Sequence, residues 1–271
     1  MPSRQAKNPT ARPADPAAPA GLTVLCLHGV GHGDAAKGWQ ADPGWRAAWR
    51  QTILAQLAAA GRPPGQVKLN CFSYDVLFGS GPSAAQIARG LELLGEVALI
   101  GLLGLFEVGR AAPALANKGF ALHPSELPKA LRWTAGMAVQ WLEDATLRDK
   151  LCLSLLKTLR AAPPDIVVAH SLGSLIAYDT LRRAVHGSSG GLADIRGLQF
   201  VSLGSQLAHP VLQLGVWGGP LMPLHDAQGD GVSRWFALFN PHDKVFTRRI
   251  DLADPQQIAL DAPFQIGRAH V

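Results

Sequence analysis

The chain has 271 residues, of which 48% are hydrophobic, and its 25 Lys and Arg against 20 Asp and Glu give a formal net charge of +5. This length and hydrophobicity suffice for one α/β domain with a substantial core. The basic residues are scattered, with no Lys/Arg run and no alternation with aromatic residues, so we expect no nucleic-acid partner.

Residues 1–20 are rich in Pro and Ala and lack the apolar core of a secretory signal peptide. Segments of this composition do not bury enough apolar surface to fold. We therefore expect a disordered N-terminal segment over residues 1–20, one folded domain over residues 21–264, and a cytoplasmic protein.

The three cysteines, Cys26, Cys71 and Cys152, lie inside apolar segments, without CxxC spacing or paired histidines. This pattern favours free thiols in a reducing compartment over a disulfide or a zinc site.

Short apolar segments that alternate with helical segments predict a sheet. Strands are expected over residues 22–27, 67–74, 165–169, 198–203 and 234–239. A helix is expected to begin at Asp42, which can accept hydrogen bonds from the first free N–H groups, and to end at Gly61. A second helix is expected over residues 175–185. Strands alternating with helices indicate an α/β fold: a mostly parallel sheet with helices on both faces.

Residues 76–160 interrupt this alternation with a long segment that is apolar, has helical spacing and contains no clear strand. We expect a helical cap insertion over one end of the sheet. Within it, residues 91–106 are short for a membrane span and carry Glu92 and Glu96, which favours a buried or interfacial helix over a transmembrane one.

The most specific motif follows the third expected strand, where Ala169, His170, Ser171, Leu172 and Gly173 lead directly into a helix. Such an abrupt turn strains its central residue and exposes the side chain, and small residues two before and two after relieve the crowding. The motif resembles the nucleophile elbow of the α/β-hydrolase superfamily, with Ala169 replacing the first glycine of the usual G-x-S-x-G. The resemblance implies the α/β-hydrolase fold, with Ser171 as nucleophile and His170 and Gly173 as elbow support. The alternative is a tight turn with an unreactive serine.

The first expected strand ends in a second motif, His28, Gly29, Val30 and Gly31. In the α/β-hydrolase superfamily an HG pair at this place supplies the oxyanion loop. The resemblance therefore implies that the backbone N–H groups of Val30 and Leu172 stabilise the developing oxyanion.

The same loop has two alternative interpretations. A phosphate-binding loop would need the G-x-G-x-x-G spacing or a Gly-Lys-Ser/Thr ending, and both are lacking. A metal site could use His28, His32 and Asp34, but these are three ligands on one loop with no second cluster. We therefore expect neither a cofactor nor a metal.

The acid that orients the catalytic imidazole is expected after a late strand. By resemblance this is Asp243, which follows the strand over residues 234–239. Asp226 and Asp230 lie in a Gly-rich loop before that strand, a composition typical of turns. The sequence SLGS over residues 202–205 is similar to stretches found after the elbow in lipase-like hydrolases and supports the fold, without a chemical role.

A serine nucleophile needs a base, and in this superfamily the chain order is Ser, acid, His. His270 is the only histidine after Asp243. Ile266 to Val271, however, can be encoded by a common sequencing adapter, in frame with its stop codon. We therefore expect residues 265–271 to be an artefactual tail and the fold to be C-terminally truncated, so that the true base is missing. If the native reading frame ends at Val271, His270 is the base; His242, adjacent to the acid, is a weaker substitute.

The resemblance implies a serine esterase or lipase-like hydrolase that cleaves carboxylic esters through an acyl-enzyme on Ser171. The apolar insertion suggests a lipid or acyl-chain substrate and peripheral contact with a membrane; the alternative is that it completes the core. The alternative functions are an acyltransferase of the same fold and a non-catalytic binding protein with the α/β-hydrolase fold.

Overall fold

In a computed structural model of the chain, the structure describes residues 21–29, 33–34, 40–41, 43–61, 63–79, 83–86, 88–89, 137–187, 191–209, 212–241 and 249–260. The expected N-terminal segment over residues 1–20 and the expected tail over residues 265–271 lie outside these ranges. The apolar stretch over residues 91–106 also lies outside them. None of the helices within these ranges is long and apolar enough to cross a membrane.

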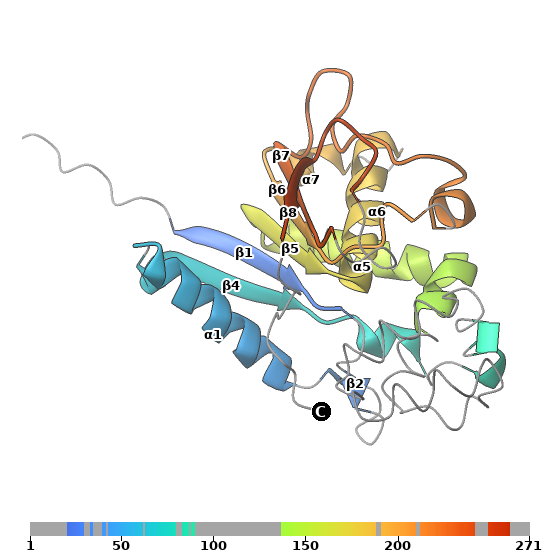
Figure 1. The fold of residues 1–271 in the computed structure, drawn as a ribbon, viewed down its shortest axis with the longest axis horizontal. Coiled ribbons are helices and arrows are strands. Elements are labelled where there is room, and N and C mark those ends of the chain that lie inside the picture. The colour runs from blue at the N-terminus through green and yellow to red at the C-terminus, as the bar shows by residue number, and fades with distance from the viewer. Residues whose placement is uncertain are drawn as a thin grey trace, which may run out of the picture.

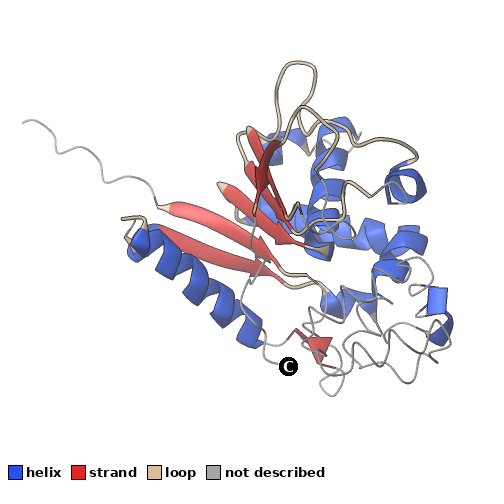
Figure 2. Cartoon of the chain, in the orientation of Figure 1, coloured by secondary structure: helices blue, strands red, loops and turns tan. Residues whose placement is uncertain are grey.

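Six parallel strands form one sheet (Figure 1; Figure 2). In spatial order they are β4 (Val67–Phe72), β1 (Leu22–Leu27), β5 (Ile166–His170), β6 (Gln199–Leu203), β7 (Arg234–Phe239) and β8 (Gln256–Ala259). A separate antiparallel pair is formed by β2 (Gly33–Asp34) and β3 (Gln40–Ala41). The expected α/β fold with a parallel sheet is confirmed.

Helices cover both faces of this sheet. They are α1 (Pro43–Ala59), α5 (Ala145–Ala161), α6 (Leu172–His186) and α7 (Leu192–Ile195), with short helical turns at Pro64–Gln66, Asp75–Phe78 and Gln213–Trp217. Residues 137–143 are also helical. In Figure 1, α1 lies along β4 and β1, whereas α5 and α6 lie on the other side of the sheet.

The side chains of β1 point alternately into two cores, one on each face of the sheet, and each core is covered by helices. Leu25 and Leu27 point into the larger core, which contains side chains of α5, α6 and α7. Val24 and Cys26 point the other way, into a smaller core with Trp45 and Trp49 of α1. Successive residues of a strand face opposite sides, so a strand buried on both faces is apolar throughout.

All five expected strands are present, with ends shifted by at most two residues. The sixth, β8, was not expected, because it is a short edge strand in which three of its four residues are exposed. Such a strand carries no apolar alternation that a sequence pattern could reveal. The expected helix over residues 175–185 is longer and begins at Leu172, immediately after Ser171.

Helix ends follow from local chemistry. The Asp144 carboxylate accepts a hydrogen bond from the Leu147 N–H at 2.9 Å and caps the start of α5. Gly61 follows α1 with φ +73°, a conformation that glycine adopts without strain, so the expected stop is confirmed. Asp42, the expected cap of α1, lies outside the described residues.

Helix α5 falls within the range expected for the cap insertion, yet it packs against α6 and contributes Leu151, Leu155 and Leu159 to the larger core. It therefore belongs to the layer that covers the sheet. Residues 90–136, the centre of the expected insertion, lie outside the described ranges.

Candidate active site

Ser171 forms the turn between β5 and α6. Its backbone has φ 50° and ψ −124°, and among the described residues it is the only non-glycine with a positive φ. An L-residue is strained in this region. The turn is held by hydrogen bonds from the Ser171 N–H to the Leu203 carbonyl at 3.0 Å and from the Ser174 N–H to the Ser171 carbonyl at 2.9 Å.

Gly173 allows the start of α6 to approach the end of β1. A Cβ atom at this position would lie 2.3 Å from the backbone oxygen of His28 and 3.1 Å from the Cβ of Leu27. A contact of 2.3 Å with backbone cannot be relieved by moving a flexible side chain. The expected role of Gly173 as elbow support therefore has a direct steric reason.

Gly29 brings the loop after β1 against the elbow. A Cβ atom at Gly29 would lie 2.8 Å from Nδ1 of His170 and 3.1 Å from the Cβ of Ser171. The two motifs that the sequence singles out, after β1 and after β5, thus meet at one point. They meet because β1 and β5 are neighbouring parallel strands, with Leu27 in register with Ala169, so their carboxyl ends lie at the same edge.

His28 is held in a fully buried pocket at this edge. Its ring stacks on Tyr74 with centroids 4.3 Å apart and is tilted against Trp45 at 4.6 Å. Its Nε2 lies 3.1 Å from a carboxylate oxygen of Asp75, which is also buried. The Tyr74 hydroxyl donates a hydrogen bond to the His28 carbonyl at 2.7 Å. These contacts anchor the backbone that leads into Gly29.

Tyr74 and Asp75 were not expected at this site. Both come directly after β4, which is the neighbour of β1. In open α/β sheets functional groups gather beyond the carboxyl ends of the strands, so the end of β4 is where such residues are expected.

A chain of hydroxyl groups supports the elbow from behind. The Ser174 hydroxyl donates to the Ser171 carbonyl at 2.5 Å and lies 2.6 Å from the Ser205 hydroxyl. Each hydroxyl has one proton, so with that of Ser174 directed at a carbonyl, Ser205 supplies the proton between the two serines. Ser205 in turn accepts from the Leu207 N–H at 3.2 Å. The SLGS sequence, to which no role was assigned, thus helps to position Ser171.

Leu172 and His170 flank the serine. Leu172 is the first residue of α6, where the helix itself provides no acceptor for the N–H group. Burial, followed by the proximity of His28, lowers the pKa of His170 to about 4, so its imidazole is neutral at pH 7. The immediate surroundings of Ser171 therefore carry no cationic imidazole from His170.

Several expected site residues lie outside the described ranges: Val30, Gly31, His242, Asp243 and His270. Described residues lie next to Val30 and shortly before Asp243. Gly29 precedes Val30 and contacts the elbow, and β7, which ends at Phe239, reaches the same edge of the sheet.

A second histidine–carboxylate pair lies at the opposite edge of the sheet by topology. His225 Nε2 lies 2.7 Å from Asp254 Oδ1. This pair precedes β7 and β8, hence it lies at the amino ends of the strands, whereas Ser171 follows a carboxyl end. His209 is different: it follows β6 by six residues and leaves the sheet at the same edge as Ser171. His209 is a candidate base that the sequence analysis did not consider.

The acidic residues before β7 have a turn role. Asp226 accepts hydrogen bonds at its side chain from the N–H groups of Gln228 and Asp230 at 2.9 and 2.8 Å. The turn interpretation of Asp226 is confirmed.

No group of three or more His, Cys, Asp or Glu side chains that could hold a metal ion is found in the part of the chain that the structure describes. His28, one of the three ligands of the alternative metal interpretation, is instead packed against aromatic rings. The side chains of His32 and Asp34 are not among those described.

Comparison of the chain with protein-family models, with curated proteins and with solved structures found no significant match.

Proposed function

We propose that this protein is a serine hydrolase of the α/β-hydrolase class that cleaves carboxylic esters through an acyl-enzyme on Ser171. The observation that carries the proposal is the backbone of Ser171, strained at φ 50° and ψ −124° in the turn from β5 to α6. A fold that only needed a tight turn here would favour glycine or asparagine, which adopt a positive φ at little cost. A serine kept in a strained conformation at the end of a strand is typical of a catalytic nucleophile.

The surroundings of Ser171 support this assignment. The hydroxyl would attack the ester carbonyl, and the oxygen that becomes negative needs preorganised donors. The Leu172 N–H at the start of α6 is one such donor, and by resemblance the Val30 N–H, one residue beyond Gly29, is the other. Each donor of this kind contributes about 3–4 kcal/mol to the stability of the transition state.

The reaction also needs a base and a water molecule. A base takes the Ser171 proton, the alcohol leaves with a proton from that base, and water then releases the acid from the serine. Asp243 is proposed to orient the base. Within this chain the candidates for the base are His209 and His242, and His270 joins them only if the native reading frame ends at Val271. Replacement of each by glutamine, in protein expressed from the native gene, identifies whether the reaction requires one of them.

An acyl-chain or lipid ester is the proposed substrate class. The support is compositional: the stretch over residues 91–106 carries two charged residues in sixteen. An apolar segment beside a hydrolytic site can line an acyl pocket or contact a membrane surface.

Ester hydrolysis tests the proposal. Purified protein expressed from the uninterrupted native gene should release p-nitrophenol from p-nitrophenyl esters. The value of kcat/KM should rise with acyl length, and a burst should appear if water attack on the acyl-enzyme is slow. Ser171→Ala should lose at least about 1000-fold in kcat. Ser154→Ala, a matched change in the middle of α5, should retain wild-type activity.

The same assay separates the alternatives. If an added alcohol captures most of the acyl group, the protein is an acyltransferase. If the wild type and Ser171→Ala are equally inactive towards all esters, the catalytic proposal fails and the non-catalytic binding protein remains.

A further inference from the structure

Two cysteines lie side by side on neighbouring strands, away from the serine. Cys26 of β1 and Cys71 of β4 are register partners in the parallel pair, and both are free thiols. Neighbouring strands are about 4.8 Å apart, which falls within the Cα separation of about 4.4–6.8 Å that a disulfide spans. Register partners point to the same face of a sheet, so the two sulfur atoms face the same side.

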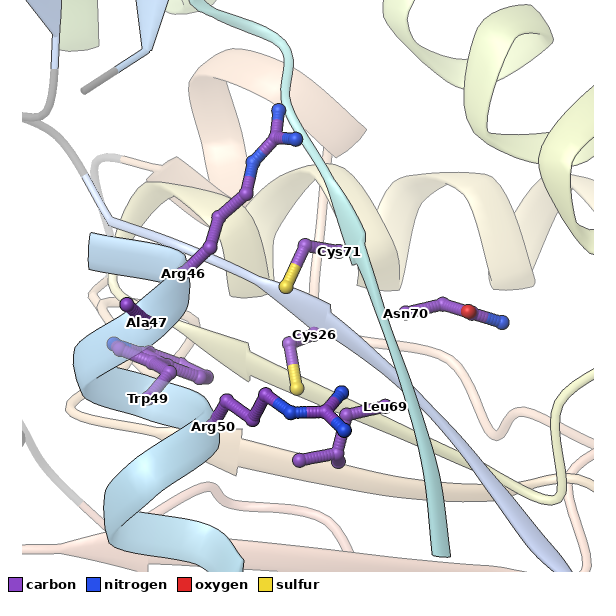
Figure 3. Close-up of a pocket in the computed structure, with 8 residues that line it drawn as sticks. All are labelled: Cys26, Arg46, Ala47, Trp49, Arg50, Leu69, Asn70 and Cys71. Atoms are coloured by element: carbon purple, nitrogen blue, oxygen red, sulfur yellow. The ribbon is translucent and has the colours of Figure 1, made fainter. Parts of the chain in front are cut away.

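The pair lines a cavity of about 320 Å³ between α1 and the edge of the sheet. Figure 3 shows both sulfur atoms on the side of the strands that faces α1, from which Arg46 and Arg50 extend; in this view Arg50 crosses near Cys26 and Arg46 points away from both sulfur atoms. Both arginines are exposed, and β4 is the edge strand, so the cavity opens at the surface of the molecule. Cys71 is partly exposed, whereas Cys26 is buried.

The environment gives the two thiols different acidities. A hydrogen bond from the Cys26 thiol lowers the pKa of Cys71, burial opposes this, and the positive charges of Arg46 and Arg50 lower the pKa further. The same hydrogen bond, together with burial, raises the pKa of Cys26. Cys71 is therefore the more acidic thiol of the pair and the better candidate nucleophile, and Cys26 is the neighbouring thiol.

We propose that Cys26 and Cys71 form a redox-modification site in which a hydroperoxide oxidises Cys71 and Cys26 then closes a disulfide. The Cys71 thiolate attacks the O–O bond, takes one oxygen and releases an alkoxide that is protonated to the alcohol, or water when the oxidant is hydrogen peroxide. The resulting sulfenic acid condenses with the Cys26 thiol, forming the S–S bond and water. In total the peroxide is reduced by two electrons and the two thiols are oxidised by two electrons.

Cys152 provides an internal control for this proposal. It is buried between α5 and α6, where its thiol donates to Asp179. Burial, with the nearby negative charge of Asp179, raises the pKa of Cys152 to about 12. Arg183 opposes this shift, but burial and Asp179 outweigh it, so the pKa of Cys152 is raised whereas that of Cys71 is lowered.

The first measurement uses the reduced full-length wild type and requires no variant. Alkylation by iodoacetamide, followed peptide by peptide with mass spectrometry, should be at least about tenfold faster at Cys71 than at Cys152 at pH 7. After hydrogen peroxide and digestion, a cross-linked peptide pair joining Cys26 and Cys71 should appear, lighter by two hydrogen atoms than the two peptides together. Equal alkylation of Cys71 and Cys152, or no such cross-link, would overturn the proposal.

Variants then assign the two roles. In Cys26→Ser, dimedone should trap a sulfenic acid on Cys71, and in Cys71→Ser, peroxide should leave Cys26 unmodified. Cys152→Ser is the matched control and should form the cross-link as the wild type does. Arg50→Gln should slow alkylation of Cys71 about two- to fivefold at pH 7, because one positive charge beside the thiolate is lost; an unchanged rate contradicts the electrostatic part of the account.

Discussion

The backbone strain at Ser171 is worth about 1–3 kcal/mol, and its immediate neighbours hold it in place. The backbone of Ser171 is hydrogen-bonded in both directions. Its N–H donates to the Leu203 carbonyl of β6, and its carbonyl accepts from the N–H and the hydroxyl of Ser174 in α6. Gly29 and Gly173 let the β1 loop and α6 come close enough to fix the turn. The position of Ser171 therefore depends on the lack of a side chain at Gly29 and Gly173 and on these hydrogen bonds.

Gly173→Ala tests the steric part of this account. The new Cβ would meet the His28 carbonyl at 2.3 Å, and forcing a methyl group into a packed site costs about 1–3 kcal/mol. We expect the free energy of unfolding, measured with urea, to fall by this amount and ester hydrolysis to be lost. Ala169→Gly, which restores the usual elbow pattern, should fold and retain activity, with a cost of up to about 1 kcal/mol. A Gly173→Ala protein with wild-type stability would contradict the geometry.

The acidity of His170 gives a second test at the same scale. Its folded pKa of about 4 lies below the ordinary value of 6.5, so between pH 4 and pH 6.5 the unfolded chain binds more protons. The free energy of unfolding should therefore rise with pH through this window and gain nothing further from His170 above it. The full shift corresponds to about 3–4 kcal/mol, and the effect should be smaller because the side chain is only partly buried.

Comparison of the wild type with His170→Gln isolates this effect. Urea unfolding at pH 4.5 and pH 7.5 should show a smaller loss of stability in the variant, because glutamine does not titrate. If both proteins lose the same stability over this range, His170 does not have the assigned acidity.

At the scale of elements, α6 carries both the elbow and a buried carboxylate that ties it to its neighbours. Asp179 is fully buried and accepts hydrogen bonds from Arg182 at 3.0 Å and from the Trp217 indole at 3.1 Å. It also forms an ion pair with Arg183 at 3.0 Å and contacts Cys152 of α5. Burial by itself would raise the pKa of Asp179, but Arg183 and Arg182 bring it below its ordinary value. One carboxylate therefore connects α5, α6 and the turn at Gln213–Trp217.

Asp179→Asn removes this charge while keeping the shape of the side chain. Loss of one partner from a buried ion pair costs about 3 kcal/mol, and we expect the midpoint of urea unfolding to fall accordingly. Asp149→Asn is the matched control: Asp149 also pairs with Arg183 but is 58% exposed, so its loss should cost well under about 1 kcal/mol. Equal effects of the two changes would show that the buried network is not what holds the helices together.

At the scale of the whole molecule, the sequence predicts the layers better than it predicts the contacts. Apolar runs such as residues 22–27 are local signals, and they identified five of the six strands of the parallel sheet. β8 escaped because its exposed residues carry no pattern. The tight turn at Ser171 has a local signal, because Ser171 and Gly173 are neighbours in sequence. Strand-end reasoning also placed the loop after β1 near this turn, and Gly29 does lie against it; the catalytic roles of these residues stay predictions.

The supporting residues were harder to find, because each acts through a partner far along the chain. Asp75 is 47 positions from His28, and Ser205 is 31 from Ser174. These pairs come together only through the order of the strands in the sheet, which cannot be predicted from the residues of one short segment. The same is true of Cys26 and Cys71, which look like two unrelated buried cysteines until β1 and β4 are paired.

Labelling with a fluorophosphonate probe tests directly whether Ser171 is an activated nucleophile. The probe phosphonylates serines that a neighbouring base activates, so the result does not depend on knowing the substrate. We predict a single adduct on the peptide containing Ser171 in wild type and in Ser154→Ala, and none in Ser171→Ala. An unlabelled folded wild type, or an adduct that persists in Ser171→Ala, would contradict the account.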